Sequence, residues 1–178
     1  ITATAPLRLD LSSGLGSDLF VLSMTEGGSA LNTAITISGQ KPVEVRVRRI
    51  PELEIRIVSK DQNTGETIRD FEAFRSVLSE DGGKNDPLQL FKAALVEAQI
   101  IPESLTGDLA RLLQNYGGGL EITANVAGIP KGSGLGVSGI LGIALLKALY
   151  EIAERPISED ELLMRLISLE LRMHSLGG

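Results

Sequence analysis

The sequence predicts an α+β domain of two layers, in which a mixed or antiparallel sheet is covered by helices on one face. Some stretches alternate apolar and polar residues with the period of a half-buried strand, and others carry the wider apolar stripe of a helix. The two kinds of stretch follow one another irregularly, which is typical of the α+β class. A chain of 178 residues can bury one core unaided. We therefore expect a single domain over residues 1–178.

The composition excludes several classes of function. A net charge of −6 and an aromatic content of 3 % leave neither the basic surface nor the stacking side chains of a nucleic-acid binder. The absence of cysteine excludes disulfides and thiolate metal sites. The longest apolar run, 140–146, is too short to cross a bilayer. We therefore expect a cytoplasmic protein with no nucleic-acid partner and no membrane partner.

The first expected strand covers residues 2–11, with Leu7, Leu9 and Leu11 facing the core and Arg8 and Asp10 facing outward. Pro6 restricts this strand to a sheet edge or places it at a strand start. The loop 12–18, rich in turn residues, follows it, and a second apolar strand is expected over 30–38. On these residues alone, Arg8 can simply be part of a solvated strand face, and Asp18 can simply cap a turn.

Two further runs, 43–48 and 53–57, alternate in the same way and are joined by the short link 49–52, which predicts a hairpin. Their polar face mixes charges of both signs, which is typical of cross-strand pairs on a wet sheet surface. The residues of that face are Glu44, Arg46, Arg48, Glu54 and Arg56.

Helical patterns follow over 71–78, 88–99 and 106–116. Asp86 and Pro87 suit the start of the second of these helices, and Gly117 suits the end of the third. We assign no chemistry to them.

A last helix begins with the capping box Ser158–Glu161 and extends to about residue 176. Its apolar stripe consists of Leu162, Leu163, Leu166, Ile167, Leu169 and Met173. Glu170 falls within this stripe, where a carboxylate is costly unless it has a partner. The alternative is a glutamate at the edge of the stripe with its carboxylate in solvent. We expect no catalytic role for His174, which lies near the end of this helix, where a positive charge is mildly favourable.

The central stretch 120–151 combines an alternating strand, a loop with four glycines and an apolar helix. Glycines let backbone N–H groups converge on a ligand, and a helix start favours an anion such as phosphate. Lys131 can add a point charge, and the Ser133 and Ser138 hydroxyls can reach phosphate or magnesium. We predict a nucleotide-phosphate loop; a glycine-rich connection without a ligand is the alternative. The loop residues are Pro130, Lys131, Gly132, Ser133, Gly134, Leu135, Gly136, Val137, Ser138 and Gly139.

Simple motif matches do not identify this loop. Gly134-x-Gly136-x-x-Gly139 fits the dinucleotide fingerprint, but residues 127–133 separate it from the strand that it should follow directly. No Gly-Lys-Ser/Thr sequence closes the loop, so the Walker pattern fails.

The run Pro130-Lys-Gly-Ser-Gly-Leu-Gly-Val-Ser138, between an amphipathic strand and an apolar helix, resembles the second motif of the GHMP small-molecule kinases. Three further segments resemble their L-fucose kinase and heptose-phosphate kinase branch: 5–12, 27–35 and 117–123. The resemblance implies a GHMP kinase N-terminal domain with a left-handed βαβ crossover around the loop, a two-layer fold that it shares with a ribosomal protein domain. It also implies phosphorylation of a small sugar with ATP and Mg²⁺ as cofactors.

The resemblance assigns roles to individual residues. It implies that 130–139 bind the nucleotide, that Ser138 and Glu170 hold Mg²⁺, and that Arg8 and Asp18 bind the sugar, with Arg8 also catalytic. Several positions depart from the family pattern. Leu15 replaces a tryptophan in the loop before Asp18, and Val137 and Gly139 stand where the family usually has hydroxyl residues.

The chain begins at Ile1 and stops at Gly178, where the resemblance implies that an aspartate-bearing segment follows. We therefore expect a piece of a longer protein, without useful kinase activity by itself. Three interpretations stay open: the nucleotide-binding half of a sugar kinase, a catalytically silent sugar- or nucleotide-binding regulatory module, and a structural module. A small-molecule sugar is the expected partner, and the sequence leaves a homodimer open.

Overall fold

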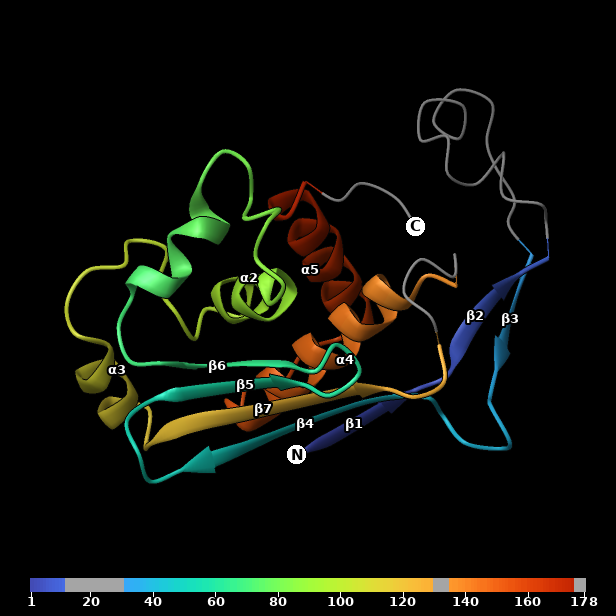
Figure 1. Cartoon of the computed structure of the whole chain (residues 1–178), viewed down its shortest axis with the longest axis horizontal. Coiled ribbons are helices and arrows are strands. Elements are labelled where there is room, and N and C mark those ends of the chain that lie inside the picture. The colour runs from blue at the N-terminus through green and yellow to red at the C-terminus, as the bar shows by residue number, and fades with distance from the viewer. Residues whose placement is uncertain (12–30, 130–134, 175–178) are drawn as a thin grey trace.

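A computed structural model describes residues 1–11, 31–129 and 135–174 (Figure 1). Five strands form one sheet in the order β1-β4-β7-β5-β6, and β2 and β3 form a small second sheet. The strands are β1 (Thr2–Ala5), β2 (Leu7–Asp10), β3 (Asn32–Ile35), β4 (Val43–Ile50), β5 (Ile55–Ser59), β6 (Thr64–Ile68) and β7 (Gly119–Val126). The helices are η1 (Glu72–Phe74), η2 (Ser76–Leu78), α2 (Gln89–Glu97), α3 (Leu109–Asn115), α4 (Val137–Ile152) and α5 (Glu159–Arg172).

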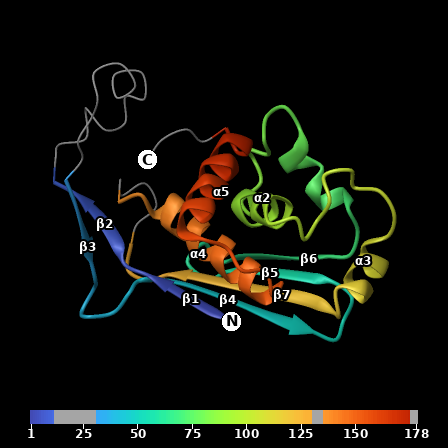
Figure 2. The ribbon, with the colours of Figure 1, turned by 180° about the vertical axis from the view of Figure 1, so that it is seen from behind.

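The predicted fold class is confirmed. Helices α2, α4 and α5 lie on the same side of the five-stranded sheet in both views (Figures 1 and 2). Helix α4 packs against β4 and β1, and α2 and α5 pack against α4. The core between the two layers is aliphatic, with Val45, Ile122, Leu145 and Leu149 fully buried.

The centre of the sheet is β7, and this arrangement contradicts the predicted hairpin between 43–48 and 53–57. Strand β7 runs antiparallel to β4 and parallel to β5, so it separates the two strands that were expected to pair. Strand β5 instead forms a hairpin with β6, which the sequence pattern did not indicate. The alternation of apolar and polar residues determines which face of the sheet a side chain lies on, but not which strand is the neighbour. A strand from a distant part of the sequence, here β7, can therefore lie between two strands that are consecutive in the chain.

Gly119, the first residue of β7, lies very close to the backbone of residues 52–54, which precede β5. A Cβ atom on Gly119 would lie 2.1 Å from the carbonyl oxygen of Glu52 and 2.3 Å from that of Glu54. Only glycine fits at this crossing. The parallel strands β5 and β7 are joined by residues 60–118, and the left-handed crossover that the resemblance implies stays a prediction.

Pro6 divides the first predicted strand into β1 and β2, which belong to different sheets. Strand β2 pairs with β3 and leads away from the main sheet (Figure 1). Leu7 is buried as expected, but Leu9 and Leu11 are 37 % and 54 % exposed, so the prediction that both face the core is wrong. A two-stranded ribbon projecting beyond the helical layer has little core to offer these side chains.

The outer face of the sheet is polar, as predicted, but its pairs differ from the expected ones. Arg48 donates two hydrogen bonds to Glu121 of β7, at 2.6 and 2.9 Å. Glu54 is not on this wet surface: it is 7 % exposed and accepts hydrogen bonds from Arg56 and Arg69. The intervening strand β7 is the reason that Glu54 cannot reach the arginines of β4.

The predicted helices are largely present, but α2 begins at Gln89 with Leu88 as its N-cap, so the prediction that Asp86 caps this helix and Pro87 begins it is wrong. The helix expected over 71–78 is two short 3-10 turns, and Asp108 caps α3 through the N–H of Ala110. Ser158 accepts a hydrogen bond from the N–H of Glu161, so the predicted capping box forms its forward bond. On α5, Leu163 and Ile167 are exposed, contrary to the predicted stripe, because α2 and α4 cover only one side of the helix. Among the described residues, no helix has both the length and the hydropathy that crossing a bilayer requires.

Candidate functional site

The start of α4 is where three elements bring several of the predicted site residues together. Gly136 is the N-cap of this 16-residue helix and has φ +63°, a left-handed conformation that favours glycine. The first turn of α4 carries no acidic side chain. The unpaired N–H groups and the positive end of the dipole at a helix start attract anions, and phosphate most of all.

Arg8 lies directly beside this helix start. A Cβ atom on Gly136 would lie 3.5 Å from both Nε and Nη2 of Arg8. The side chain comes from β2, which contacts α4 because Pro6 ends the preceding strand and redirects the chain. The guanidinium group therefore adds a full positive charge to the partial charge of the helix end.

Glu170 approaches the same helix start from α5. A Cβ atom on Gly139 would lie 3.1 Å from Oε1 of Glu170, so the missing side chain of Gly139 leaves the room that this carboxylate uses. Burial raises the pKa of the Glu170 carboxyl above its ordinary value, and the charge of Arg8 acts in the opposite direction. The carboxylate therefore faces α4, which differs from the alternative of a carboxylate held in solvent.

The other predicted residues divide into two groups. Leu135 and Val137 are half-buried and pack against the core, whereas Ser138 is exposed. Asp18 and the segment 130–134, which holds Pro130, Lys131, Gly132, Ser133 and Gly134, lie outside the described residues. The structure thus brings together Arg8, Gly136, Gly139 and Glu170, from three elements.

The described residues fit a magnesium ion that is coordinated mainly by phosphate oxygens of a bound nucleotide and by water. Within residues 1–11, 31–129 and 135–174, no group of three or more His, Asp or Glu side chains gathers as a metal site. Magnesium commonly takes one or two carboxylates from a protein and completes its shell with phosphate oxygens and water. A single carboxylate beside a phosphate-binding helix start suits that arrangement.

The raised pKa of Glu170 predicts a specific effect of pH on stability. Between the unfolded and the folded pKa the native state binds more protons, so the free energy of unfolding falls as pH rises through that window. Glu170→Gln should therefore stabilise the chain at neutral pH, by less than about 1 kcal/mol because the carboxyl remains partly solvated. Urea denaturation from about pH 4 to about pH 8 would measure this, and a constant difference between the two proteins would contradict it.

Sequence reasoning missed a buried charged group between α2 and α5. Glu97 is 4 % exposed and accepts hydrogen bonds from Arg165, Ser168 and Arg172 of α5. A signal was present, since Glu97 follows an apolar run in α2 and a carboxylate there needs a partner.

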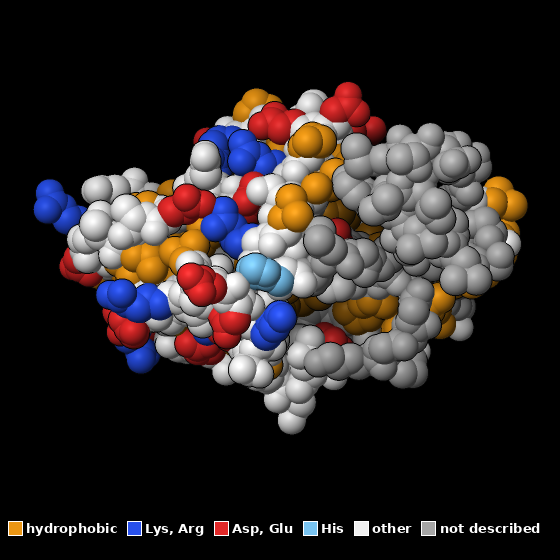
Figure 3. Space-filling view, turned by 90° about the horizontal axis from the view of Figure 1, so that it is seen from above, with side chains coloured by type: hydrophobic (Ala, Val, Ile, Leu, Met, Phe, Trp, Pro, Cys, Tyr) orange, Lys and Arg blue, Asp and Glu red, His pale blue; other side chains and the backbone are white. Residues whose placement is uncertain are grey.

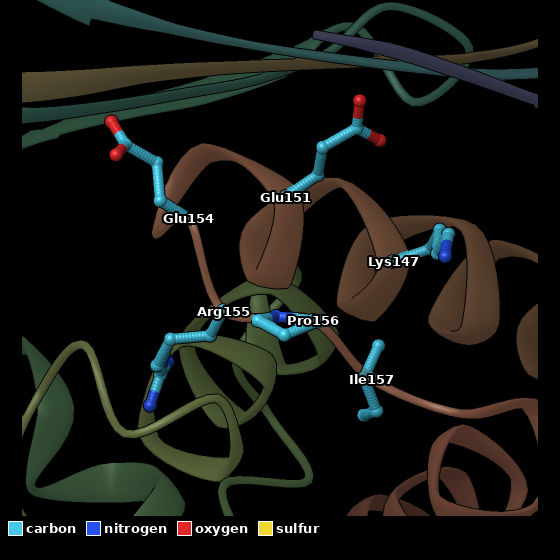
Figure 4. Close-up of a pocket in the computed structure, with 6 residues that line it drawn as sticks. All are labelled: Lys147, Glu151, Glu154, Arg155, Pro156 and Ile157. Carbon is cyan, nitrogen blue, oxygen red and sulfur yellow. The ribbon is translucent and has the colours of Figure 1, made fainter.

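Two surface hollows lie elsewhere in the described part of the chain. One, of about 200 Å³, is at the far end of α4 and is lined by Lys147, Glu151, Glu154, Arg155, Pro156 and Ile157 (Figure 4). Its charged side chains point apart and form no common binding group (Figure 4). The other, of about 260 Å³, lies between β1, α4 and the start of α5. Neither includes Arg8 or Glu170.

Comparison with known proteins relates the chain to a kinase family. Residues 104–178 match the family model of the GHMP kinases N terminal domain. The chain is 31 % identical over 177 residues to an L-fucokinase/L-fucose-1-P guanylyltransferase of Bacteroides fragilis, covering 98 % of this chain and 18 % of that protein. It is 28 % identical over 173 residues to a bifunctional fucokinase/GDP-fucose pyrophosphorylase of Arabidopsis thaliana, covering 97 % and 15 %.

A solved structure has the same fold. The D-glycero-D-manno-heptose 1-phosphate kinase of Bacteroides thetaiotaomicron superposes with a TM-score of 0.67 at 26 % identity, over 99 % of this chain and 50 % of that one. The chain thus spans less than a fifth of each fucokinase and half of the heptose kinase. The predicted family is confirmed: the chain resembles sugar kinases over its length, has their fold, and in residues 104–178 matches the N-terminal domain of GHMP kinases.

Proposed function

We propose that this chain is the nucleotide-binding half of an ATP-dependent kinase that phosphorylates a small sugar. The observation that carries the proposal is the meeting of Arg8, Gly136 and Glu170 at the start of α4. A positive side chain, a helix start and a carboxylate are the groups needed to hold a triphosphate together with its magnesium ion. The names of the related fucokinases and heptose kinase support the sugar as the acceptor.

Phosphoryl transfer asks little covalent chemistry of the protein, which must position the reactants and neutralise developing charge. We assign the backbone N–H groups of 132–139 to the phosphates. Ser138 and Glu170 would hold Mg²⁺, which supplies charge neutralisation between phosphate oxygens. Arg8 would orient the acceptor sugar together with Asp18. Because its guanidinium lies beside the helix start, its charge would also attract the nucleotide phosphates and stabilise the transferred group.

The chain spans 18 % and 15 % of the two related fucokinases. Because the chain spans only part of each relative, turnover belongs to the whole protein in our proposal, and residues 1–178 by themselves bind nucleotide without useful turnover. A cytoplasmic location and a homodimer stay predictions from the sequence.

Calorimetry with ADP and Mg²⁺ tests the proposal directly. We expect the chain to bind MgADP, and Arg8→Gln to weaken that binding about tenfold through the loss of one charge-assisted contact. Arg46→Gln is the control, because its exposed side chain pairs only weakly with Glu44 on β4 of the sheet and should leave the affinity unchanged. Absence of binding by the unaltered chain would refute the nucleotide site.

A catalytically silent sugar- or nucleotide-binding module is the second candidate. Leu15, at a position where the fucose kinase pattern has tryptophan, favours it, because an aromatic platform for the sugar ring is lost. Tight sugar binding by the whole protein without transfer of phosphate from ATP would select this candidate over the kinase.

A further inference from the structure

Helix α5 is fastened to α2 mainly by one buried carboxylate; in addition, Nε2 of Gln89 donates a hydrogen bond to the backbone oxygen of Met173, the C-cap of α5. Oε1 of Glu97 accepts a hydrogen bond from Nη1 of Arg165 at 3.3 Å. Oε2 accepts from Oγ of Ser168 at 3.0 Å and from Nη2 of Arg172 at 3.4 Å. We call these four residues the Glu97 clamp. All three of its donors come from α5, so the clamp acts on that helix alone.

The clamp and Glu170 occupy different sides of α5. At about 100° per residue, Arg165, Ser168 and Arg172 fall on one side of the helix, and Glu170 lies about 140° to 160° away from each of them. A hydrogen-bonded group on one side therefore sets the direction in which the opposite side points. Directional hydrogen bonds can fix this rotation, whereas the buried Leu162 and Leu169 contribute non-directional attraction.

A small rotation of α5 would move the Glu170 carboxylate away from its position beside Gly139. A carboxylate about 6 Å from a helix axis moves by about 1 Å when the helix turns by about 10°. The carboxylate already lies close to Gly139, where a Cβ atom would be 3.1 Å from Oε1. On the outer side of α5, Leu163, Met164, Ile167 and Leu171 are exposed, so this side contributes little packing that could hold the rotation. Apolar side chains reach the surface in the view of the helical side (Figure 3).

We propose that Glu97 is a positioning residue, which acts through the rotation of α5 to hold the Glu170 carboxylate at the start of α4. The consequence for metal binding rests on the proposed function, in which Glu170 holds Mg²⁺. Displacement of a ligand by about 1 Å is enough to weaken a metal or catalytic site substantially.

Two variants separate positioning from general stability. Glu97→Gln keeps the size of the side chain but removes the buried charge shared by Arg165 and Arg172. The remaining partners of these arginines, Glu161 and Glu103, are exposed, so they constrain the rotation of α5 less. Glu54→Gln is the matched control, because Glu54 is also buried, at 7 % exposure, and is also held by two arginines. The partners of Glu54 are Arg56 on β5 and Arg69 after β6, so its loss leaves α5 untouched.

The first measurement is independent of any ligand. In the unaltered chain, the α protons of Gly139 and the γ protons of Glu170 should give a nuclear Overhauser effect, since the two groups are in near contact. We expect Glu97→Gln to lose this effect and Glu54→Gln to retain it. An effect that persists in Glu97→Gln, or that disappears in both variants, would overturn the proposal.

The second measurement is the gain in ADP affinity that Mg²⁺ provides, taken as the ratio of the dissociation constants without and with the metal. Glu97→Gln should reduce this gain about tenfold and leave the metal-free affinity within about twofold. Glu54→Gln should keep the gain, and an unchanged gain in Glu97→Gln would count against positioning. If the unaltered chain shows no gain, the proposed function fails, and the nuclear Overhauser comparison alone decides the positioning role.

Discussion

Replacing Gly136 by aspartate is expected to abolish useful nucleotide binding while the domain stays folded. The new carboxylate would stand at the N-cap of α4, beside the guanidinium of Arg8, where the phosphates are proposed to bind. It would neutralise Arg8 and repel the phosphates, since two unit charges about 4 Å apart interact by several kcal/mol near a protein surface. We expect the affinity for MgADP to fall about a hundredfold or more, as measured by calorimetry.

The fold should tolerate this change for two reasons. Aspartate and asparagine are the side chains that best accept the left-handed conformation, and both serve well as helix N-caps. A Cβ atom at this position meets its nearest neighbours at 3.5 to 3.6 Å, which is ordinary contact. Gly136→Asn is therefore the matched control, with the same shape and no charge. Equal weakening by both variants would show that shape, rather than charge, accounts for the loss.

The second large effect is expected on stability, at Lys92 of α2. Its side chain is 6 % exposed, and its Nζ lies 2.7 Å from Oδ2 of Asp86 and 2.8 Å from Oε2 of Glu66. The contact with Glu66 ties the helical layer to the edge strand β6. Lys92→Met keeps the aliphatic stem but leaves two carboxylates facing each other without a cation. Removal of one partner from a buried ionic group should lower the free energy of unfolding by about 3 kcal/mol.

The pH dependence gives this prediction a second check. Burial by itself would lower the pKa of Lys92, but the hydrogen bonds that its Nζ donates to Asp86 and Glu66, with the charges of these carboxylates, outweigh burial and raise the pKa above its ordinary value. The stability gained from a lysine with a raised pKa is present in full below the unfolded pKa and is lost as pH rises through the folded one. The difference between Lys92→Met and the unaltered chain should therefore stay constant from about pH 6 to about pH 9 and shrink above that.

Urea denaturation measures both effects, and Arg46→Met is the comparison. The Arg46–Glu44 pair is 3.6 Å long with both side chains largely exposed, so its loss should change the free energy of unfolding by less than about 0.5 kcal/mol. If Lys92→Met unfolds at the same urea concentration as the unaltered chain, the buried ionic group does not stabilise the fold.

Much of the fold could be predicted from local patterns. The strand 120–126, the helix after the glycine loop and the capping box at Ser158 each depend on residues close together in the sequence, and each is present. The wrong predictions concern strand pairs and helix faces whose contacts come from residues far away in the sequence. The expected hairpin is wrong because β7 lies between β4 and β5. Leu163 was predicted to be buried because an apolar stripe does not show which part of a helix surface its neighbours cover.

The candidate site likewise has some features that the local sequence predicts and others that depend on contacts between distant residues. The glycine loop and its helix start are local features, and the resemblance to GHMP kinases placed Arg8 and Glu170 in the site by motif. Glu97 had no motif, and its role depends on three side chains about 70 residues later in the chain. Predicting it would have required the packing of α2 on α5.

By itself, the sequence determined most of the strands and helices, the position of the glycine-rich loop between β7 and α4, and which family the chain resembles, because periodicity, caps and motifs are properties of neighbouring residues. Only the tertiary structure decided that β7 is the central strand, that Pro6 turns Arg8 toward α4, and that Glu170 faces Gly139. These outcomes depend on contacts between segments that are distant in the sequence, from 31 residues apart for Gly139 and Glu170 to 128 for Arg8 and Gly136. No local pattern contains the energies of such contacts.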